Sequence, residues 1–278
     1  GHGIARNLDA AGLLVWAHDT NPDAVSAAKF SARVASIGSD DQAGDIVVFA
    51  VPSCADIAGH LSDAPPRRGQ IILDLTTSDP ARSRALAAQM ADLGVGYVDA
   101  AMTGGAAGAD AGALTLMIGG AQGDVAACRP VFDAIAGNTF HLGDIGAGHA
   151  MKLIHNLILH SSFLATCEGL RLADRAGINL DSAVDVLNAG NARSFVTEVR
   201  FPRDILSGTM NARSRIANLE KDLGLALDFA ATSDARVPYA TLTRTILAQS
   251  LSAGQADADF SNLFLQFEDL IDTMKDAI

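Results

Sequence analysis

The run from Gly146 to Asn156 contains two residues whose types and spacing could support proton transfer. Lys152 and Asn156 lie four residues apart in a segment whose apolar periodicity predicts a helix, and residues i and i+4 share one helix face. Their ammonium and carboxamide groups are therefore expected to point into one space. Gly146 and Gly148 lack side chains, so a flat ligand could approach the backbone beside them. The alternative is a solvated lysine on an amphipathic helix.

The composition limits the class of protein. With 278 residues, 49% of them hydrophobic, the chain is long enough for two domains with sizeable cores. The net charge of −12 argues against a nucleic-acid surface. No apolar run is long enough to cross a bilayer, and no signal peptide is visible. We therefore expect neither a nucleic-acid partner nor a membrane span.

The cysteines and histidines form no metal-binding pattern. The three cysteines are odd in number and widely spaced, which favours buried thiols in a reducing compartment such as the cytoplasm. The seven histidines also lack the spacing of metal ligands. No metal site is expected.

Residues 1–145 are expected to form an α/β domain. Short apolar runs alternate with helical stretches such as 80–93 and 124–136. Continuous apolar strands that alternate with helices imply a mostly parallel sheet covered on both faces. The expected strands are 13–17, 46–51, 71–75, 96–99, 114–118 and 139–142.

Residues 146–278 are expected to form an all-helical domain, because the strand pattern disappears after Gly148. One long helix is predicted over residues 151–176, with Gly177 as its C-terminal glycine. Helical patterns then continue to the end of the chain. They are expected to break near Pro202, Gly208 and Pro238.

The first residues look like part of a dinucleotide-binding βαβ unit. The chain opens Gly1-His2-Gly3, continues as a helix and reaches a strand that ends at Asp19. The helix N-terminus would face a pyrophosphate, and Asp19 would accept hydrogen bonds from the adenosine ribose. A 2′-phosphate would be repelled, so NAD is favoured over NADP. The unit's first strand is missing, as expected for a cut sequence or for a shortened chain with impaired NAD binding.

Three motifs carry a resemblance that covers nearly the whole chain. Asp99-Ala-Ala-Met-Thr-Gly-Gly105 is similar to a substrate-binding signature, and Gly146 to Asn156 matches the pattern Gly-x-Gly-x-x-x-Lys-x-x-x-Asn. Lys221-Asp222-Leu223 is the third element. In this order and spacing they resemble the β-hydroxyacid dehydrogenase family, which includes 3-hydroxyisobutyrate dehydrogenase and the 6-phosphogluconate dehydrogenases. The resemblance implies a Rossmann-type domain followed by an all-α domain.

The resemblance also implies roles for individual residues. Lys152 would be the general acid/base and Asn156 would help place the substrate. Thr103, Gly104 and Gly105 would bind the substrate carboxylate; successive glycines expose backbone N–H groups and the hydroxyl adds a donor. The alternative for these three is a plain glycine turn. The residues implied to contact NAD are Gly1, His2, Gly3, Asp19, Val51, Pro52, Thr77 and Lys221.

Some positions depart from the family pattern. Thr103 replaces the usual serine, and Ala101-Met102 replaces Pro-Val, a change expected to loosen that loop. Both departures leave the size of the substrate open. Arg193 and Ser194 could contact a distal substrate group, or they could simply begin a helix with an exposed arginine.

The implied reaction is reversible oxidation of a short β-hydroxy acid by NAD. The long helix is apolar on more than one side, which predicts a homodimer or a dimer of dimers. One alternative is an imine reductase of the same architecture, although that group usually has another residue at the lysine position. A second is a non-catalytic, dimerising remnant. Decarboxylation of a sugar-acid phosphate is disfavoured by the chain length and the lack of a basic cluster.

Overall fold

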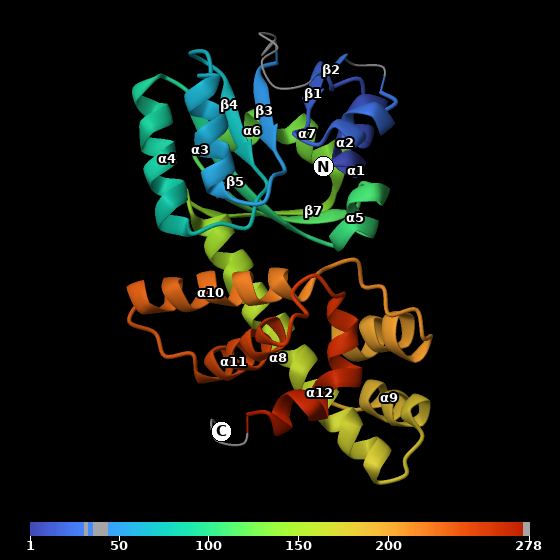
Figure 1. Ribbon diagram of the computed structural model, residues 1–278. Helices are drawn as coiled ribbons and strands as arrows, with labels where there is room; N and C mark the ends of the chain where they lie inside the picture. The colour runs from blue at the N-terminus through green and yellow to red at the C-terminus, as the bar shows by residue number, and fades with distance from the viewer. Residues whose placement is uncertain (31–32, 36–43, 275–278) are drawn as a thin grey trace. The chain divides into compact units, whose positions relative to one another are not determined.

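The computed structural model describes residues 1–30, 33–35 and 44–274. The chain divides into two compact units, Gly1–Lys152 and Leu153–Ile278, and each is described by itself (Figure 1). Within the described ranges, no helix combines the length and the hydropathy that a bilayer crossing requires.

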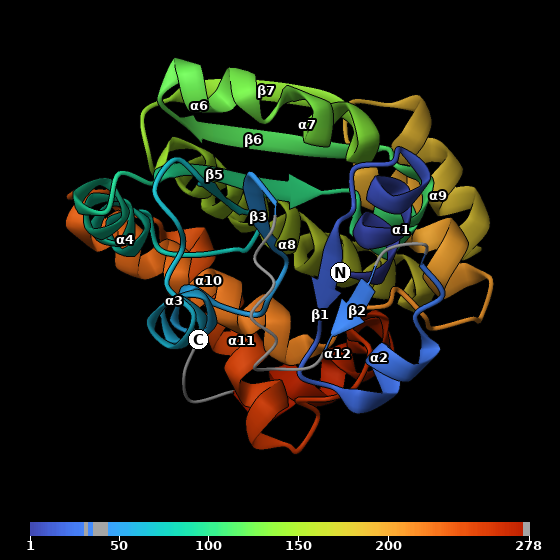
Figure 2. The same ribbon diagram turned by 90° about the horizontal axis from the view of Figure 1, so that it is seen from above.

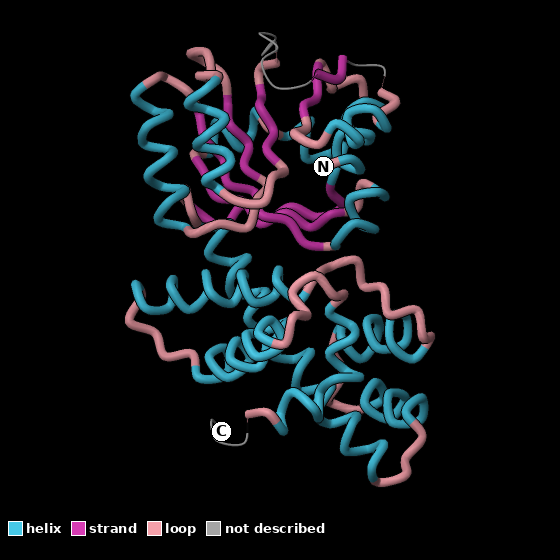
Figure 3. The backbone as a smooth tube through the Cα atoms, viewed as in Figure 1, coloured by secondary structure: helices cyan, strands magenta, loops and turns pink. Residues whose placement is uncertain are grey.

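The first unit is built on a mostly parallel, five-stranded sheet with the order β3-β4-β5-β6-β7 (Figure 3). Only the β5–β6 pair is antiparallel in this sheet, and β1 and β2 form a separate parallel pair. The predicted α/β class is therefore confirmed. The strands are β1 (Trp16–His18), β2 (Arg33–Ala35), β3 (Ile46–Phe49), β4 (Ile71–Asp74), β5 (Gly96–Thr103), β6 (Leu114–Gly120) and β7 (Ala136–Gly143).

Helices cover both faces of the sheet, since its central strands are apolar on both sides. One core joins Leu73 and Val98 to apolar residues of α1 and α7. The other joins Ile72 and Tyr97 to α3 and α4. Ile72 and Tyr97 are adjacent in sequence to Leu73 and Val98, so their side chains point to the opposite face of the sheet. Figure 2 shows α3 and α4 on one side of the sheet and α6 and α7 on the other. The helices are α1 (His2–Ala10), α2 (Pro22–Ala27), α3 (Cys54–Asp63), α4 (Pro80–Asp92), α5 (Gly105–Ala111), α6 (Gln122–Ala127) and α7 (Arg129–Ile135).

Among its described residues, the second unit contains helices and connecting loops but no strand. Its core includes an aromatic group in which Phe163 and Phe201 pack against Phe260 and Phe264. Helix α8 begins within the first unit and runs on into the second. The elements are α8 (Ala147–Arg175), α9 (Leu180–Ala189), the π-helix η1 (Val196–Leu206), α10 (Ile216–Thr232), α11 (Pro238–Ser252), the 3₁₀ helix η2 (Phe260–Asn262) and α12 (Leu263–Asp272).

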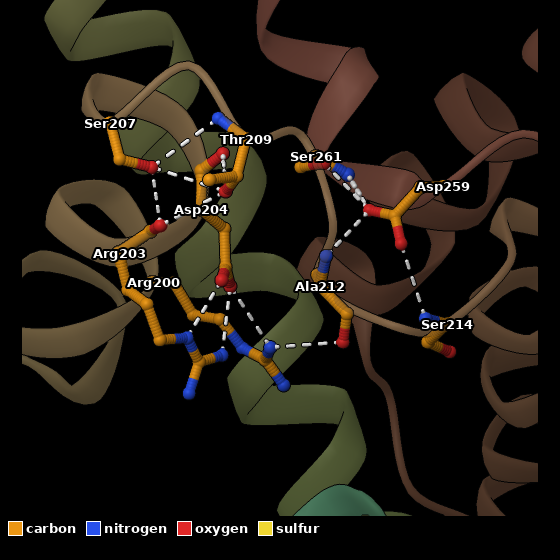
Figure 4. Close-up of polar contacts among 9 residues, drawn as sticks. All are labelled: Arg200, Arg203, Asp204, Ser207, Thr209, Ala212, Ser214, Asp259 and Ser261. Carbon is orange, nitrogen blue, oxygen red and sulfur yellow. Dashed lines mark hydrogen bonds and ion pairs between the residues drawn. The ribbon is translucent and has the colours of Figure 1, made fainter. Parts of the chain in front are cut away.

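A buried carboxylate stabilises the end of η1 (Figure 4). Asp204 accepts hydrogen bonds from Arg203 at 2.7 and 2.9 Å and from Arg200 at 3.2 Å. Burial raises the pKa of Asp204, but the hydrogen bonds from Arg203 and Arg200 outweigh it and leave that pKa below its usual value. The carboxylate is therefore ionised and paired, as a buried charge requires.

A second carboxylate fixes the segment that leads into α10 (Figure 4). Asp259 accepts from the backbone N–H groups of Ala212 at 3.1 Å and Ser214 at 3.3 Å, and also from Ser261. These bonds determine where α10, the helix of Lys221 and Asp222, begins.

Several element boundaries differ from the sequence predictions. The helix expected over 124–136 is two helices, α6 and α7, separated at Cys128. The break expected near Pro202 is wrong, because Pro202 lies inside η1. The wider turn of a π-helix leaves room for a ring that, in an α-helix, clashes with the carbonyl of residue i−4. Ala101 and Met102 lie within β5 rather than in a loosened loop.

Candidate active site

The first turn of α8 is anchored to β5 by a single carboxylate. Asp99 is fully buried in β5. Its Oδ1 accepts from the backbone N–H of Gly146 at 2.6 Å and its Oδ2 from that of His149 at 2.8 Å. Burial raises the pKa of Asp99, although these backbone hydrogen bonds oppose the rise. An acceptor at a helix N-terminus satisfies N–H groups that have no intrahelical partner, so Asp99 determines the position at which α8 starts.

The two glycines before Lys152 serve close packing. A Cβ atom built on Gly148 would lie 2.2 Å from the carbonyl oxygen of Met117 and 2.8 Å from Asp99 Oδ2. One built on Gly146 would lie 2.7 Å from a guanidinium nitrogen of Arg84 and 3.1 Å from the carbonyl oxygen of Pro80. The expectation that these glycines leave bare backbone for a flat ligand is wrong. They let the start of α8 contact the sheet and α4 directly.

Lys152 and Asn156 both lie on α8 and both are buried. Their exposed fractions are 8% and 4%, respectively. The solvated-lysine alternative is therefore excluded. They are four positions apart in an α-helix, so they lie on the same face of α8.

The amide of Asn156 has a defined orientation. Its Nδ2 donates to Asp222 Oδ2 at 2.7 Å, and its Oδ1 lies 3.0 Å from Nδ1 of His155. Asp222 also pairs with Lys221, whose Nζ lies 3.3 Å from Oδ1. Lys221 is about half exposed. The carboxylate of Asp222, on α10, therefore fixes the orientation of the Asn156 amide on α8.

The segment Thr103–Gly105 joins β5 to α5. Thr103 is the last residue of β5, and Gly104 and Gly105 follow with φ values of +118° and +64°. Both glycines are exposed, and no side chain caps the start of α5. These left-handed conformations favour glycine. The segment offers backbone N–H groups and a hydroxyl, as an anion-binding turn requires.

The N-terminal residues proposed to contact NAD have different surroundings. Gly1 precedes α1, and a Cβ atom there would meet nothing within 4 Å. His2 is exposed. Gly3 is a packing glycine, because a Cβ atom there would lie 2.9 Å from the backbone of Ala109. Asp19 is exposed after β1 and accepts a hydrogen bond from the next turn.

Two other predicted cofactor positions follow neighbouring strands. Val51 and Pro52 come after β3, and Thr77 comes after β4. Because β3 and β4 are parallel neighbours, these residues lie at the same carboxyl edge of the sheet, which is where open α/β sheets bind ligands. Val51 and Thr77 are half-buried and Pro52 is exposed.

The distal-contact hypothesis for Arg193 and Ser194 gains no support. Arg193 is exposed and lies 3.6 Å from Glu198. The hydroxyl of Ser194 accepts from the backbone N–H of Thr197 at 3.3 Å, while Thr197 donates to the Ser194 carbonyl. The pair begins a helix, as the simpler alternative had it.

Four further residues of the site, Asp74, Asp99, His149 and Asp222, have no individual role among the sequence predictions. Asp74 lies within an otherwise apolar strand, Ile-Ile-Leu-Asp. A carboxylate inside a buried strand needs hydrogen-bond partners, so this pattern alone indicates that Asp74 takes part in a polar network. The partners themselves are distant in sequence and could not be identified from spacing.

Comparison with known families identifies the chain. Residues 1–143 match the family model described as the NAD binding domain of 6-phosphogluconate dehydrogenase. Residues 146–266 match the model described as NAD-binding of NADP-dependent 3-hydroxyisobutyrate dehydrogenase. The chain belongs to the β-hydroxyacid dehydrogenase family. It is therefore an NAD-binding oxidoreductase.

Individual members of the family align over nearly the full chain. A 2-(hydroxymethyl)glutarate dehydrogenase of Eubacterium barkeri is 28% identical, covering 97% of this chain and 92% of the relative. A probable 3-hydroxyisobutyrate dehydrogenase of Mycobacterium bovis is 30% identical, covering 93% and 91%. The solved 3-hydroxyisobutyrate dehydrogenase of Mycobacterium tuberculosis, with L-serine, has a TM-score of 0.87 and 27% identity, covering 96% and 94%.

The imine-reductase alternative is less well supported by these comparisons. An imine reductase from Pseudomonas sp. matches with a TM-score of 0.61 and 20% identity, covering 96% of this chain and 95% of the reductase. At that identity the likeness shows a shared fold. The hydroxyacid dehydrogenases match this chain better than the imine reductase does, in both sequence and structure.

Proposed function

We propose that this protein transfers a hydride between NAD and a short β-hydroxy acid, with Lys152 as general acid/base. The observation that carries the proposal is a buried amine one helical turn from a buried amide of fixed orientation. Three relatives are named for 3-hydroxyisobutyrate, 2-(hydroxymethyl)glutarate and L-serine. Each of these compounds carries a hydroxyl on the β-carbon of a carboxylic acid. The substrate class proposed here is that shared chemistry.

The substrate carboxylate would bind at Thr103, Gly104 and Gly105. The hydroxyl of Thr103 and the backbone N–H groups of the two glycines can all donate hydrogen bonds. A group of donors suits an anion. Asn156 would donate its remaining Nδ2 N–H to the substrate, because Asp222 already accepts from the other N–H of the same nitrogen.

The nucleotide would be held by the start of α1, by Asp19 and by the loops after β3 and β4. The exposed carboxylate of Asp19 fits the adenosine ribose of a dinucleotide. A carboxylate accepts from ribose hydroxyls and repels a 2′-phosphate, so NAD is proposed over NADP. When bound, the nicotinamide ring accepts a hydride.

Lys152 would move the hydroxyl proton. In oxidation, its neutral amine takes the proton from the substrate hydroxyl; in reduction, its ammonium returns it to the carbonyl oxygen. A lysine in water is almost entirely charged at neutral pH. The oxidation direction therefore requires the neutral amine of Lys152.

NAD reduction over a panel of short hydroxy acids tests the proposal. We expect turnover with at least one acid bearing a β-hydroxyl, and none with the same acids lacking that hydroxyl. Lys152→Ala should lower kcat by at least about 10²-fold, the usual contribution of general acid–base catalysis, while calorimetry shows unchanged NAD affinity. Wild-type rates in the Lys152→Ala variant, or turnover of cyclic imines alone, would contradict the proposal.

We further propose that residues 1–145 bind the nucleotide and that residues 146–278 support substrate binding and dimerisation. Helix α8 exposes Ile154, Ile158 and Leu172, an apolar surface that a second copy could cover. A homodimer or a dimer of dimers should therefore appear in light scattering at micromolar concentration. A monomer at that concentration would contradict this part of the proposal.

We propose a cytoplasmic location because the cysteines are present as free thiols. All three cysteines are free, and Cys128 and Cys167 are buried. Burial raises the pKa of Cys128 to about 12. Buried, protonated thiols are unreactive and suit a reducing compartment. Cell fractionation with antibody detection would test this location.

A further inference from the structure

A buried histidine in the first turn of α8 is not used by the mechanism above. His149 is completely buried. Its Nδ1 lies 2.6 Å from the hydroxyl of Ser83 on α4. The ring also lies between two carboxylates, with Nε2 3.8 Å from Asp74 Oδ1 and Nδ1 4.0 Å from Asp99 Oδ2.

The first of these carboxylates shapes the turn after β4. Asp74 Oδ1 accepts from the backbone N–H of Thr76 at 2.9 Å and from its hydroxyl at 2.6 Å. Asp74 Oδ2 accepts from the hydroxyl of Tyr97 at 2.7 Å. Burial and the nearby Asp74 carboxylate raise the pKa of Tyr97, so Tyr97 remains a donor. This turn continues directly into Thr77, a proposed nucleotide contact.

The second carboxylate shapes the start of α8. Asp99 accepts from Gly146 and from the backbone N–H of His149 itself, three residues before Lys152. Each carboxylate thus organises a different part of the proposed site. His149 is the side chain that lies against both of them.

We propose that His149 is a positioning residue that fixes the helix turn of Lys152 relative to the turn of Thr77. The inference rests on the proposed function, since it concerns the alignment of the acid/base with the nucleotide-binding turn. All of the groups involved belong to the first unit.

A purely structural role explains the arrangement less well. An apolar side chain would fill the space without the cost of burying an imidazole beside two carboxylates. Among the described residues, Nε2 of His149 has no hydrogen-bond partner. The contacts that His149 does make, to the Ser83 hydroxyl and against both carboxylates, form a buried polar network, and such networks rigidify the elements they join.

The test compares two substitutions of nearly equal shape. His149→Asn keeps a donor that can reach the Ser83 hydroxyl, and His149→Leu removes it. We expect His149→Leu to lower kcat by roughly 10²-fold, as for a small misplacement of a catalytic group, and His149→Asn to restore most of that loss. NAD affinity should be unchanged in both. The primary isotope effect with carbon-deuterated substrate should rise in His149→Leu, because hydride transfer becomes slower than product release.

Ser83→Ala keeps the test decisive where the leucine variant does not fold. It removes the partner of Nδ1 with little change in volume and should lower kcat several-fold. The rate of Lys152 acetylation, measured by mass spectrometry against exposed Lys29, gives a readout that needs no substrate. It should change several-fold in the same variants.

Lys152→Ala, measured alongside, separates the two claims. A fully active Lys152→Ala variant would overturn the proposed function. An inactive Lys152→Ala variant, together with folded His149→Leu and Ser83→Ala variants that keep wild-type kcat, isotope effect and Lys152 acetylation, would overturn the role of His149 alone.

Discussion

Two pairs of glycines flank the proposed chemistry, and their surroundings are opposite. Gly104 and Gly105 are exposed, and a Cβ atom on Gly105 would meet nothing within 4 Å. Gly146 and Gly148 contact backbone and side-chain atoms so closely that neither tolerates a Cβ atom without movement. The first pair leaves space that a ligand can use. The second pair removes space so that α8 can contact the sheet.

The difference shows that a glycine-rich motif does not specify its own role. Both pairs resemble ligand-binding signatures in sequence. What separates them is the neighbouring carbonyl of Met117 and the carboxylate of Asp99, which come from strands distant in the chain.

Alanine substitutions should show this contrast most strongly. Gly148→Ala places a methyl group 2.2 Å from a backbone carbonyl that cannot move away, and we expect a loss above about 4 kcal/mol, the range of severe backbone or packing defects. Gly105→Ala meets only the left-handed backbone cost of about 1–2 kcal/mol. Denaturant titrations measure both. Equal stabilities of the two variants would contradict the assignment of the pairs.

The ligand-binding side of the comparison can be sharpened at Thr103. Thr103→Val removes the hydroxyl and keeps the shape, and a lost hydrogen bond to a charged group is worth about 1.5–3 kcal/mol. We therefore expect KM for the hydroxy acid to rise roughly tenfold or more with little change in kcat. Thr115→Val is the matched control, because Thr115 is the cross-strand partner of Thr103. Similar kinetics in both variants would remove Thr103 from the carboxylate site.

Further along α8, the contact between Asp222 and Asn156 also positions a residue of the proposed site. Asp222→Asn replaces the acceptor of the Asn156 amide with a group of the same size that can turn a donor toward it. We expect kcat/KM to fall roughly tenfold, about 1.4 kcal/mol, with unchanged NAD affinity. Asp228→Asn, at an exposed position of the same helix, should have no effect. If both variants behaved alike, Asp222 would have no role in orienting Asn156.

The far end of α8 should show the smallest effect. A hydrogen bond from Arg175, with a contribution from Arg171, lowers the pKa of Glu268 to about 2. A lowered carboxylate pKa stabilises the fold above the ordinary value of 4.5, and this contribution is lost as the pH falls towards about 2. Glu268→Gln should therefore be slightly less stable at pH 7.

Denaturant midpoints over this pH range check that prediction. The gap between Glu268→Gln and the wild type should narrow as the pH falls below about 4.5. Glu168→Gln, at an exposed position of α8, serves as the control. A gap that is independent of pH would show that the ion pairs of Glu268 do not stabilise this end of the helix.

The sequence predicted the elements that periodicity determines. Most of the parallel strands, the long helix ending before Gly177 and the shared face of Lys152 and Asn156 follow from local patterns of apolar residues. Strand β2 (Arg33–Ala35) was not predicted. The helix break at Pro202 was wrong because a π-helix accommodates the proline, a choice that depends on packing and not on local propensity.

The contacts that position the site could not be predicted in the same way. Asp99 binds N–H groups nearly fifty residues later in the chain, and Asp222 binds Asn156 from another helix. Such pairs depend on how the chain folds back on itself. Buried carboxylates could be recognised as needing partners, but their partners could not be named.

The most direct test of the central claim is rescue of Lys152→Ala by added amines. If the Lys152 amine transfers the hydroxyl proton, small primary amines should restore turnover saturably, and the rescued rate should depend on the pKa of the amine. Exposed Lys29→Ala should keep its activity and show no response. A Lys152→Ala variant that turns over at the wild-type rate without added amine would contradict the account.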